Sequence, residues 1–175
     1  MEYRWELAHP LRDVDYIVEM GKEYLSQEDG MIVRTDPEVF RHHVTVSCTN
    51  QLFDKYKEFI AVAKEDPYSI LGYCWYDRGG YTTYSREEIS NARFHHVDLT
   101  LSVRTRYKLL NDMIDQHILW ADMCKIPVVC STSIRGDHEG FMRIHRKRGF
   151  IVHGSYAWIR TEEAMKELNG RSSKY

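Results

Sequence analysis

The chain has 175 residues and a formal net charge of −2, with 43% hydrophobic and 13% aromatic residues. This composition supports a buried core, which argues against disorder, and the length suits one domain of ordinary size. The small net charge predicts no nucleic-acid or membrane partner, and no apolar run approaches the roughly 20 residues of a membrane-spanning helix.

Five elements and a loop are expected in the first half. The alternation in residues 3–7 (YRWEL) is the period-2 pattern of a strand, and apolar spacing predicts a helix from 11 to 25. Asp36 and Pro37 are a typical helix start, so a second helix should run towards Cys48. Two further segments follow: a β-hairpin made of residues 59–63 and 70–76, and a polar loop over residues 81–93.

The second half is more strongly patterned. Residues 97–103 alternate apolar and polar side chains, which predicts a strand, and a long amphipathic helix should follow from about 105 to 124. Residues 128–133 read as a buried central strand, so strand, helix and strand should form a parallel crossover. A short helix is expected at 138–148, closed by Gly149, and a last strand at 150–160. The expected single domain is therefore residues 1–160, followed by a short tail at 161–175.

Cysteine usage and the first residues suggest a compartment. The four cysteines are widely spaced and form no CxxC pair, and MEYRWELAHP does not resemble a signal peptide. Reduced thiols in a cytoplasmic protein are the expectation.

This order of elements resembles that of the GNAT superfamily of acyl-CoA N-acyltransferases. IHRKRGF at 144–150 is similar to that family's L-Y-x-x-x-G-F ending of the last helix, and SYAWIR at 155–160 to the strand that follows it. HHVDLTLSV at 95–103 resembles the central strand that splays from its neighbour to admit the cofactor. The implied fold is a mixed, mostly antiparallel α/β sheet with a parallel central strand pair and helices on both faces.

The resemblance implies acetyl transfer from acetyl-CoA to an amine. A bulged strand at a V-shaped gap would pair with the pantetheine, and the next helix would hold the pyrophosphate at its start. Leu101 and Val103 would then lie on the cofactor side. The family's glycine-rich loop is absent from residues 103–109, so Arg104, Arg106 and Lys108 would have to bind the phosphates. A plain helix start with solvated basic residues is the alternative.

Three residues are candidates for proton transfer. Asp98 on the polar face of the expected central strand is the first choice as base, and His96 is the second. His145 replaces the family's tyrosine, often the acid that protonates the departing thiolate. Each could instead be structural: a polar strand residue or a helix histidine among cations.

Other functions remain open. The missing glycine loop also fits a non-catalytic GNAT-fold structural or binding subunit, resembling compact acetyltransferase-like proteins of tailed phages, some of them virion-associated. The adjacent pairs His42-His43 and His95-His96 lack metal-ligand spacing, so no metal is expected. The acceptor amine or protein partner is not indicated by the sequence.

Overall fold

The computed structural model describes residues 2–26, 35–66, 69–133 and 138–154. Their elements follow the predicted order: β1 (Arg4–Leu7), α1 (Val14–Ser26), α2 (Pro37–Phe53), β2 (Glu58–Lys64), β3 (Ile70–Gly80), β4 (Ile89–Val97), α3 (Val103–Met123), β5 (Val128–Ser131) and α4 (His138–Lys147). The predicted tail at 161–175 lies outside the described residues.

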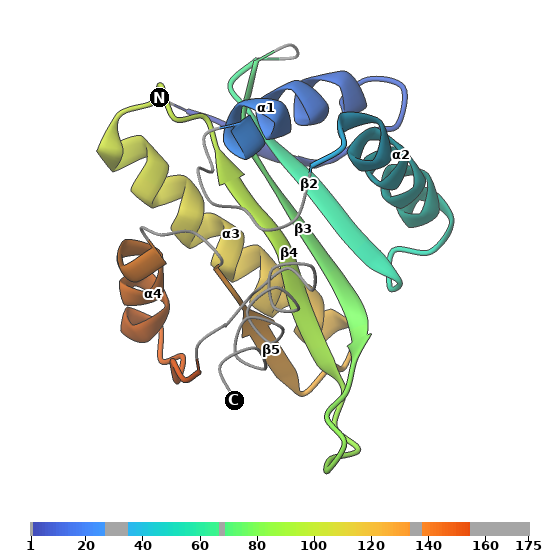
Figure 1. Cartoon of the computed structure of the whole chain (residues 1–175), viewed down its shortest axis with the longest axis vertical. Coiled ribbons are helices and arrows are strands. Elements are labelled where there is room, and N and C mark those ends of the chain that lie inside the picture. Colours follow the sequence, from blue (N-terminus) through green and yellow to red (C-terminus); the bar gives the residue numbers. More distant parts are fainter. Residues whose placement is uncertain (1, 27–34, 67–68, 134–137, 155–175) are drawn as a thin grey trace, which may run out of the picture.

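The five described strands form one sheet in the order β1-β2-β3-β4-β5 (Figure 1). The first four strands pair antiparallel, whereas β4 and β5 pair in parallel, joined through α3. This is the predicted mixed, mostly antiparallel α/β sheet, and the parallel crossover through the long helix is confirmed.

Helices cover both faces of the sheet, as predicted. Val14 and Ile17 of α1 and Val44 of α2 pack against one face, together with Trp75 of β3. On the opposite face, α3 buries a row of apolar side chains against the sheet, including Leu109, Met113 and Trp120. Helix α4 lies near α3 (Figure 1), where Arg148 donates to Asp115 on α3 at 2.8 Å. The two faces therefore hold separate apolar clusters.

The predicted strand at 97–103 is wrong, because the strand ends at Val97 and begins at Ile89, inside the segment that was expected to be a loop. The backbone turns at Asp98, whose carboxylate accepts hydrogen bonds from the backbone and hydroxyl of Thr100. Ser102 then caps α3 through the amide of Thr105. Hydrogen bonds from polar side chains to the nearby backbone compete with regular secondary structure. Here they outweigh the tendency of the alternating apolar and polar residues to form a strand.

The last predicted strand is not seen in its described part. Residues 150–154 have no regular secondary structure, and 155–160 lie outside the described residues. Around the crossover, Ile114 is buried, whereas Leu101 and Val129 are only partly buried.

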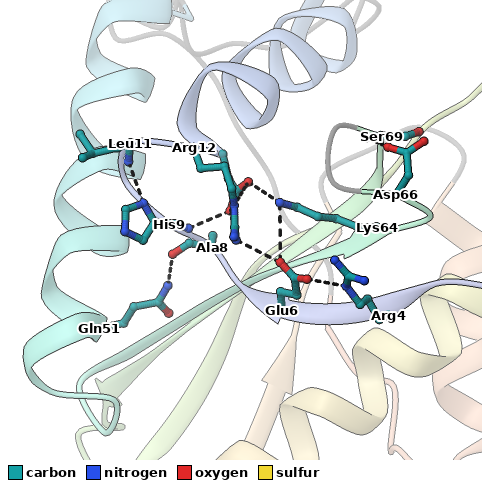
Figure 2. Close-up of polar contacts among 11 residues, drawn as sticks. Arg4, Glu6, Ala8, His9, Leu11, Arg12, Gln51, Lys64, Asp66 and Ser69 are labelled. Carbon is teal, nitrogen blue, oxygen red and sulfur yellow. Dashed lines mark hydrogen bonds and ion pairs between the residues drawn. The ribbon is translucent and has the colours of Figure 1, made fainter.

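A buried charge network joins β1, the start of α1 and the end of β2. Lys64 and Asp13 are each 1% exposed, and Lys64 Nζ donates to Asp13 Oδ1 at 2.6 Å. Arg12 donates to the other Asp13 oxygen at 2.9 Å. Figure 2 shows Glu6 receiving contacts from Arg4, Arg12 and Lys64. Every charge in the network therefore has an opposite partner.

Candidate active site

Strand β4 carries a bulge in the middle of the sheet. Trp75 of β3 pairs with Phe94 and the next residue, Tyr76, pairs with Ala92, so Arg93 is the extra residue on β4. A bulge of this kind bends a strand and changes the direction of the side chains beyond it. Arg93 lies over the Trp75 ring at 5.1 Å and pairs with Asp77.

Strand β5 separates from β4 at the same place. The parallel pairing covers only Ile89–Ala92 of β4 against Val128–Ser131 of β5. Beyond the bulge residue Arg93, residues 94–97 of β4 pair with β3 on one side, and no described strand pairs with their other side. In Figure 1 the arrow of β4 continues well past the end of β5. The sheet therefore offers a backbone edge that an extended ligand could join.

The start of α3 follows this open edge after a five-residue turn. Ser102 Oγ accepts the amide of Thr105 at 3.2 Å, and the Ser102 carbonyl accepts the amide of Arg106 at 2.9 Å. The cap leaves the amides of Val103 and Arg104 unengaged by Ser102. A helix start with such amides favours a bound anion.

The basic residues of α3 differ in their surroundings. Arg104 is exposed, and Arg106 is partly buried, with its Nε buried and without a hydrogen bond to any described residue. Lys108 instead lies over the ring of Tyr3 at 4.4 Å. Val103 is 72% exposed at the helix start, and Leu101 packs partly into the core.

His145 of α4 is 1% exposed and has one unused nitrogen. Its Nδ1 lies 3.0 Å from the carbonyl oxygen of Phe141, which can only accept, so Nδ1 carries the proton. Its Nε2 is buried with no hydrogen-bond partner among the described residues. Burial lowers the pKa of His145, and nearby Arg148 lowers it further, against the opposing effect of the Phe141 bond. The ring of His145 is therefore neutral, with a lone pair on Nε2.

His96 and Asp98 are not brought together with His145. The buried ring of His96 lies 5.5 Å from Tyr73, which belongs to the cluster under α1 and α2. Asp98 lies in the turn after β4, with its carboxylate bonded to Thr100. The histidine beside His145 is instead His95, with ring centroids 6.2 Å apart.

The sequence prediction missed His95 because the strand was placed too late and the bulge at Arg93 was not anticipated. With β4 at Ile89–Val97, the simple alternation of a strand would put the adjacent residues His95 and His96 on opposite faces.

Comparison with solved structures supports the fold. No protein-family model and no curated protein matches the chain. The structure is similar to a predicted acetyltransferase from Clostridium acetobutylicum, solved with acetyl-CoA (TM-score 0.69, 14% identity, 93% of this chain and 98% of that one). It is also similar to glucosamine-6-phosphate N-acetyltransferase from Arabidopsis thaliana (TM-score 0.60, 10% identity, 92% and 99% covered).

A third similar structure is the ribosomal-protein-alanine N-acetyltransferase of Brucella melitensis biovar Abortus 2308, at TM-score 0.61 and 14% identity, with 91% of this chain and 99% of that one covered. The chain has the GNAT acetyltransferase fold. Within that fold, the separation of β4 from β5 and the start of α3 lie next to each other, which makes this region the candidate active site.

Among the described residues, no group of three or more His, Cys, Asp or Glu side chains could hold a metal ion. No described helix is long and apolar enough to cross a membrane.

Proposed function

We propose that this chain is an acyl-CoA-dependent N-acyltransferase that moves an acetyl group from acetyl-CoA to an amine. The observation that carries this proposal is the open edge of β4, which begins at the bulge at Arg93 and leads to the start of α3. An extended chain of amides with an anionic end fits such an edge followed by a helix start. The similarity to a structure solved with acetyl-CoA supports the same cofactor.

Backbone hydrogen bonds would hold most of the cofactor, and positively charged side chains would add to them. Pantetheine amides would pair with residues 93–97, and the pyrophosphate would meet the amides of Val103 and Arg104, which Ser102 does not engage. Arg104 and Arg106 would add charge-assisted hydrogen bonds, with the unpartnered Nε of Arg106 as the clearest donor. Leu101, Val103 and Lys108 remain predicted cofactor contacts, although Lys108 already contacts Tyr3.

Acetyl transfer requires movement of one proton. The amine nitrogen bonds to the thioester carbon, the carbon–sulfur bond breaks, and the proton lost by nitrogen ends on sulfur. His145 has the buried, unpartnered nitrogen that such a transfer needs. Asp98 and His96, proposed from the sequence as bases, can be tested by Asp98→Asn and His96→Gln, which should slow turnover without weakening CoA binding if either acts on the amine.

Calorimetry with CoA at low ionic strength tests cofactor binding. Arg106→Ala should weaken binding by about 1.5–3 kcal/mol if the guanidinium bonds to a phosphate. Arg86→Ala is the matched control, because Arg86 is an exposed arginine in the segment between β3 and β4, and it should change affinity little. Binding should weaken as salt rises, since it depends on charge.

Thiol release from acetyl-CoA, measured against a panel of small amines, amino acids and peptides, tests the reaction. CoA binding with amine-dependent thiol release would support the proposal. No binding at millimolar CoA would contradict it and favour a non-catalytic GNAT-fold subunit, such as a virion-associated protein. The observation behind this second candidate is the lack of glycine from 103 to 109 and the use of the Thr105 amide by Ser102.

A further inference from the structure

Arg93 lies where the open edge of β4 begins. It is the extra residue of the bulge, and β5 stops pairing with β4 at the residue before it, Ala92. The start of α3 follows the other end of this edge, after Val97. A cofactor with its phosphates at α3 would run back along β4, so its thioester end would lie near Arg93. Bulges next to active sites commonly change the direction of a side chain, so the Arg93 side chain is a candidate for contact with the acceptor.

The guanidinium of Arg93 is held on two sides. Its Nε donates to Oδ2 of Asp77 on β3, and its central carbon lies over the ring of Trp75, 5.1 Å from the ring centroid. Asp77 and Trp75 are two residues apart on β3, so they share one face of the sheet. Trp75 is 2% exposed and stacks on Phe94 at 5.8 Å. The guanidinium therefore rests on a fixed support.

The two terminal nitrogens of Arg93 are available to a ligand. Neither Nη1 nor Nη2 has a hydrogen bond or an ion pair with any described residue, because the carboxylate of Asp77 meets Nε. The side chain is 44% exposed, and since Nε and one face are covered, this exposure falls on the Nη edge. An arginine already held in place loses little side-chain freedom when it binds a ligand.

The chemistry of this edge favours an anion. Two parallel N–H groups of one guanidinium fit the two oxygens of a carboxylate or of a phosphate, and such charge-assisted bonds are stronger than bonds between neutral groups. A neutral or cationic group at the same place would not form them. The free Nη edge of Arg93 therefore distinguishes ligands by charge.

The carboxylates near Arg93 leave room for an anion. Asp77 has a side chain that is 19% exposed, and its second oxygen is buried without a hydrogen-bond partner among the described residues. Glu58 lies opposite Asp77 on β2, so the whole of β3 separates it from β4, at about 10 Å between backbones. A ligand that arrives from solvent meets Arg93 before either carboxylate. The two negative charges weaken the attraction, so a moderate preference for anions is expected.

We propose that Arg93 selects the acceptor, which is a small primary amine that also carries a carboxylate or a phosphate group. This inference rests on the proposed acetyl transfer and names its substrate class. Arg93 binds the anionic group through Nη1 and Nη2, which keeps the amine near the thioester end of the cofactor. Asp77 is a positioning residue, because it holds the guanidinium through Nε and does not itself contact the acceptor.

Two pairs of amines that differ in the anionic group test the proposal: β-alanine with its amide, and phosphoethanolamine with ethanolamine. In the wild type, kcat/KM should be higher for the charged member of at least one pair, and the pair that shows it tells carboxylate from phosphate. Arg93→Gln should lower this preference about tenfold or more, mainly through KM. The intrinsic reactivity of each amine cancels, because the same ratio is compared in the wild type and the variant.

Three further variants separate selection from a structural role. Arg86→Gln should keep the preference, since Arg86 is an exposed arginine between β3 and β4. Arg93→Lys should keep part of it, because the charge remains and the paired N–H groups are lost. Asp77→Asn should raise KM for the charged amines and leave KM for the uncharged amines within about twofold. A loss of equal size for charged and uncharged amines would show that Arg93 and Asp77 only support the fold.

Nuclear magnetic resonance of the wild-type protein needs neither turnover nor a variant that folds. In the ¹⁵N-labelled protein saturated with CoA, millimolar sodium phosphate or sodium acetate should shift the Nε–H signal of Arg93 and leave that of Arg86 unchanged. Sodium chloride at the same ionic strength should shift neither signal.

The outcomes distinguish the two proposals. If CoA binds but neither phosphate nor acetate shifts the Arg93 signal, or if turnover shows no preference for the charged amines, selection by Arg93 is wrong and the acetyltransferase proposal stands. If the wild type does not bind CoA at millimolar concentration, both proposals are wrong.

Discussion

Asp13 and Lys64 form a pair whose two charged groups are almost completely removed from water. Burial alone would raise the pKa of Asp13, but hydrogen bonds from Arg12 and Lys64 outweigh it, and the pKa lies below its usual value. A buried pair of this kind contributes less than its Coulomb attraction suggests, because both ions lose their hydration. The loss of one partner is more costly, because it leaves a buried charge uncompensated.

Asp13→Asn should therefore lower the free energy of unfolding by about 3–5 kcal/mol. Urea denaturation followed by circular dichroism measures the loss. Glu19→Gln is the matched control, because Glu19 pairs with Lys22 on the exposed side of α1, and it should cost at most about 0.5 kcal/mol. A loss near 1 kcal/mol for Asp13→Asn would mean that Arg12 and Glu6 rearrange to compensate.

The cluster of His95, His117 and His145 predicts loss of stability in acid. The pKa values of His95, His117 and His145 all lie below the ordinary value in the folded state, so the unfolded chain binds protons more readily. Their contribution is complete above the unfolded pKa of about 6.5 and is lost as the pH falls towards the folded values, about 3 for His117. Unfolding in urea at pH 7.5, 6 and 5 should show a falling midpoint.

His117→Gln should reduce that dependence on pH while lowering stability at pH 7.5, since it loses the stacking on Tyr76. The variant also removes one of the histidines that take up a proton when the protein unfolds in acid. An unchanged slope of stability against pH in His117→Gln would show that the carboxylates, such as Asp13, account for the acid sensitivity.

At the scale of single residues, the sequence identified His145 through its similarity to a helix-ending motif, and the structure gives that residue a buried nitrogen with no hydrogen-bond partner among the described residues. His95 could not be chosen over His96, because that choice depends on a bulge at Arg93. A bulge shifts every later side chain and has no reliable signature in one sequence.

At the scale of elements, most predicted ends of the helices and of the β2–β3 hairpin lie within a few residues of the observed ends. Asp36 and Pro37 do start α2, where the Asp36 carboxylate accepts the amides of Glu38 and Val39. Strand β4 was misplaced because its first six residues, ISNARF, include three polar side chains and contain the bulge. Burial of its backbone between β3 and β5 depends on tertiary pairing, which local propensity does not record.

The close contact between β3 and β4 predicts that a larger side chain at Gly72 lowers the stability of the protein. A methyl group on Gly72 would lie 2.6 Å from the backbone oxygen of His96, so β4 would have to move where it approaches the candidate site. Gly72→Ala should cost about 1–3 kcal/mol as an overpacking change. Thermal unfolding by calorimetry measures it.

Gly140→Ala provides the control within a helix. A methyl group there meets nothing within 4 Å, and alanine is the better helix former by about 1 kcal/mol, so this variant should be neutral or more stable. If Gly72→Ala also left the melting temperature unchanged, the close approach of β3 and β4 would not hold in solution.

At the scale of the whole molecule, the order of elements was enough to predict the fold, because several moderate patterns agreed with one another. The chain retains this fold at 10–14% identity to the similar solved structures. Function does not follow from fold to the same extent, since a fold can host several activities. The start of α3 is an example, because the fold is kept although residues 103–109 contain no glycine.

The charge network of Figure 2 bears on the order in which the molecule assembles. The anions nearest to Lys64, Glu6 and Asp13, both belong to the first thirteen residues, more than fifty positions earlier in the chain. The end of β2 can leave water only after that segment has docked, since an ammonium group buried without an anion is too costly. Residues 6–13 thus supply the counter-charges for Lys64 at the end of β2, and late docking of this short segment would delay the pairing of β1 with β2.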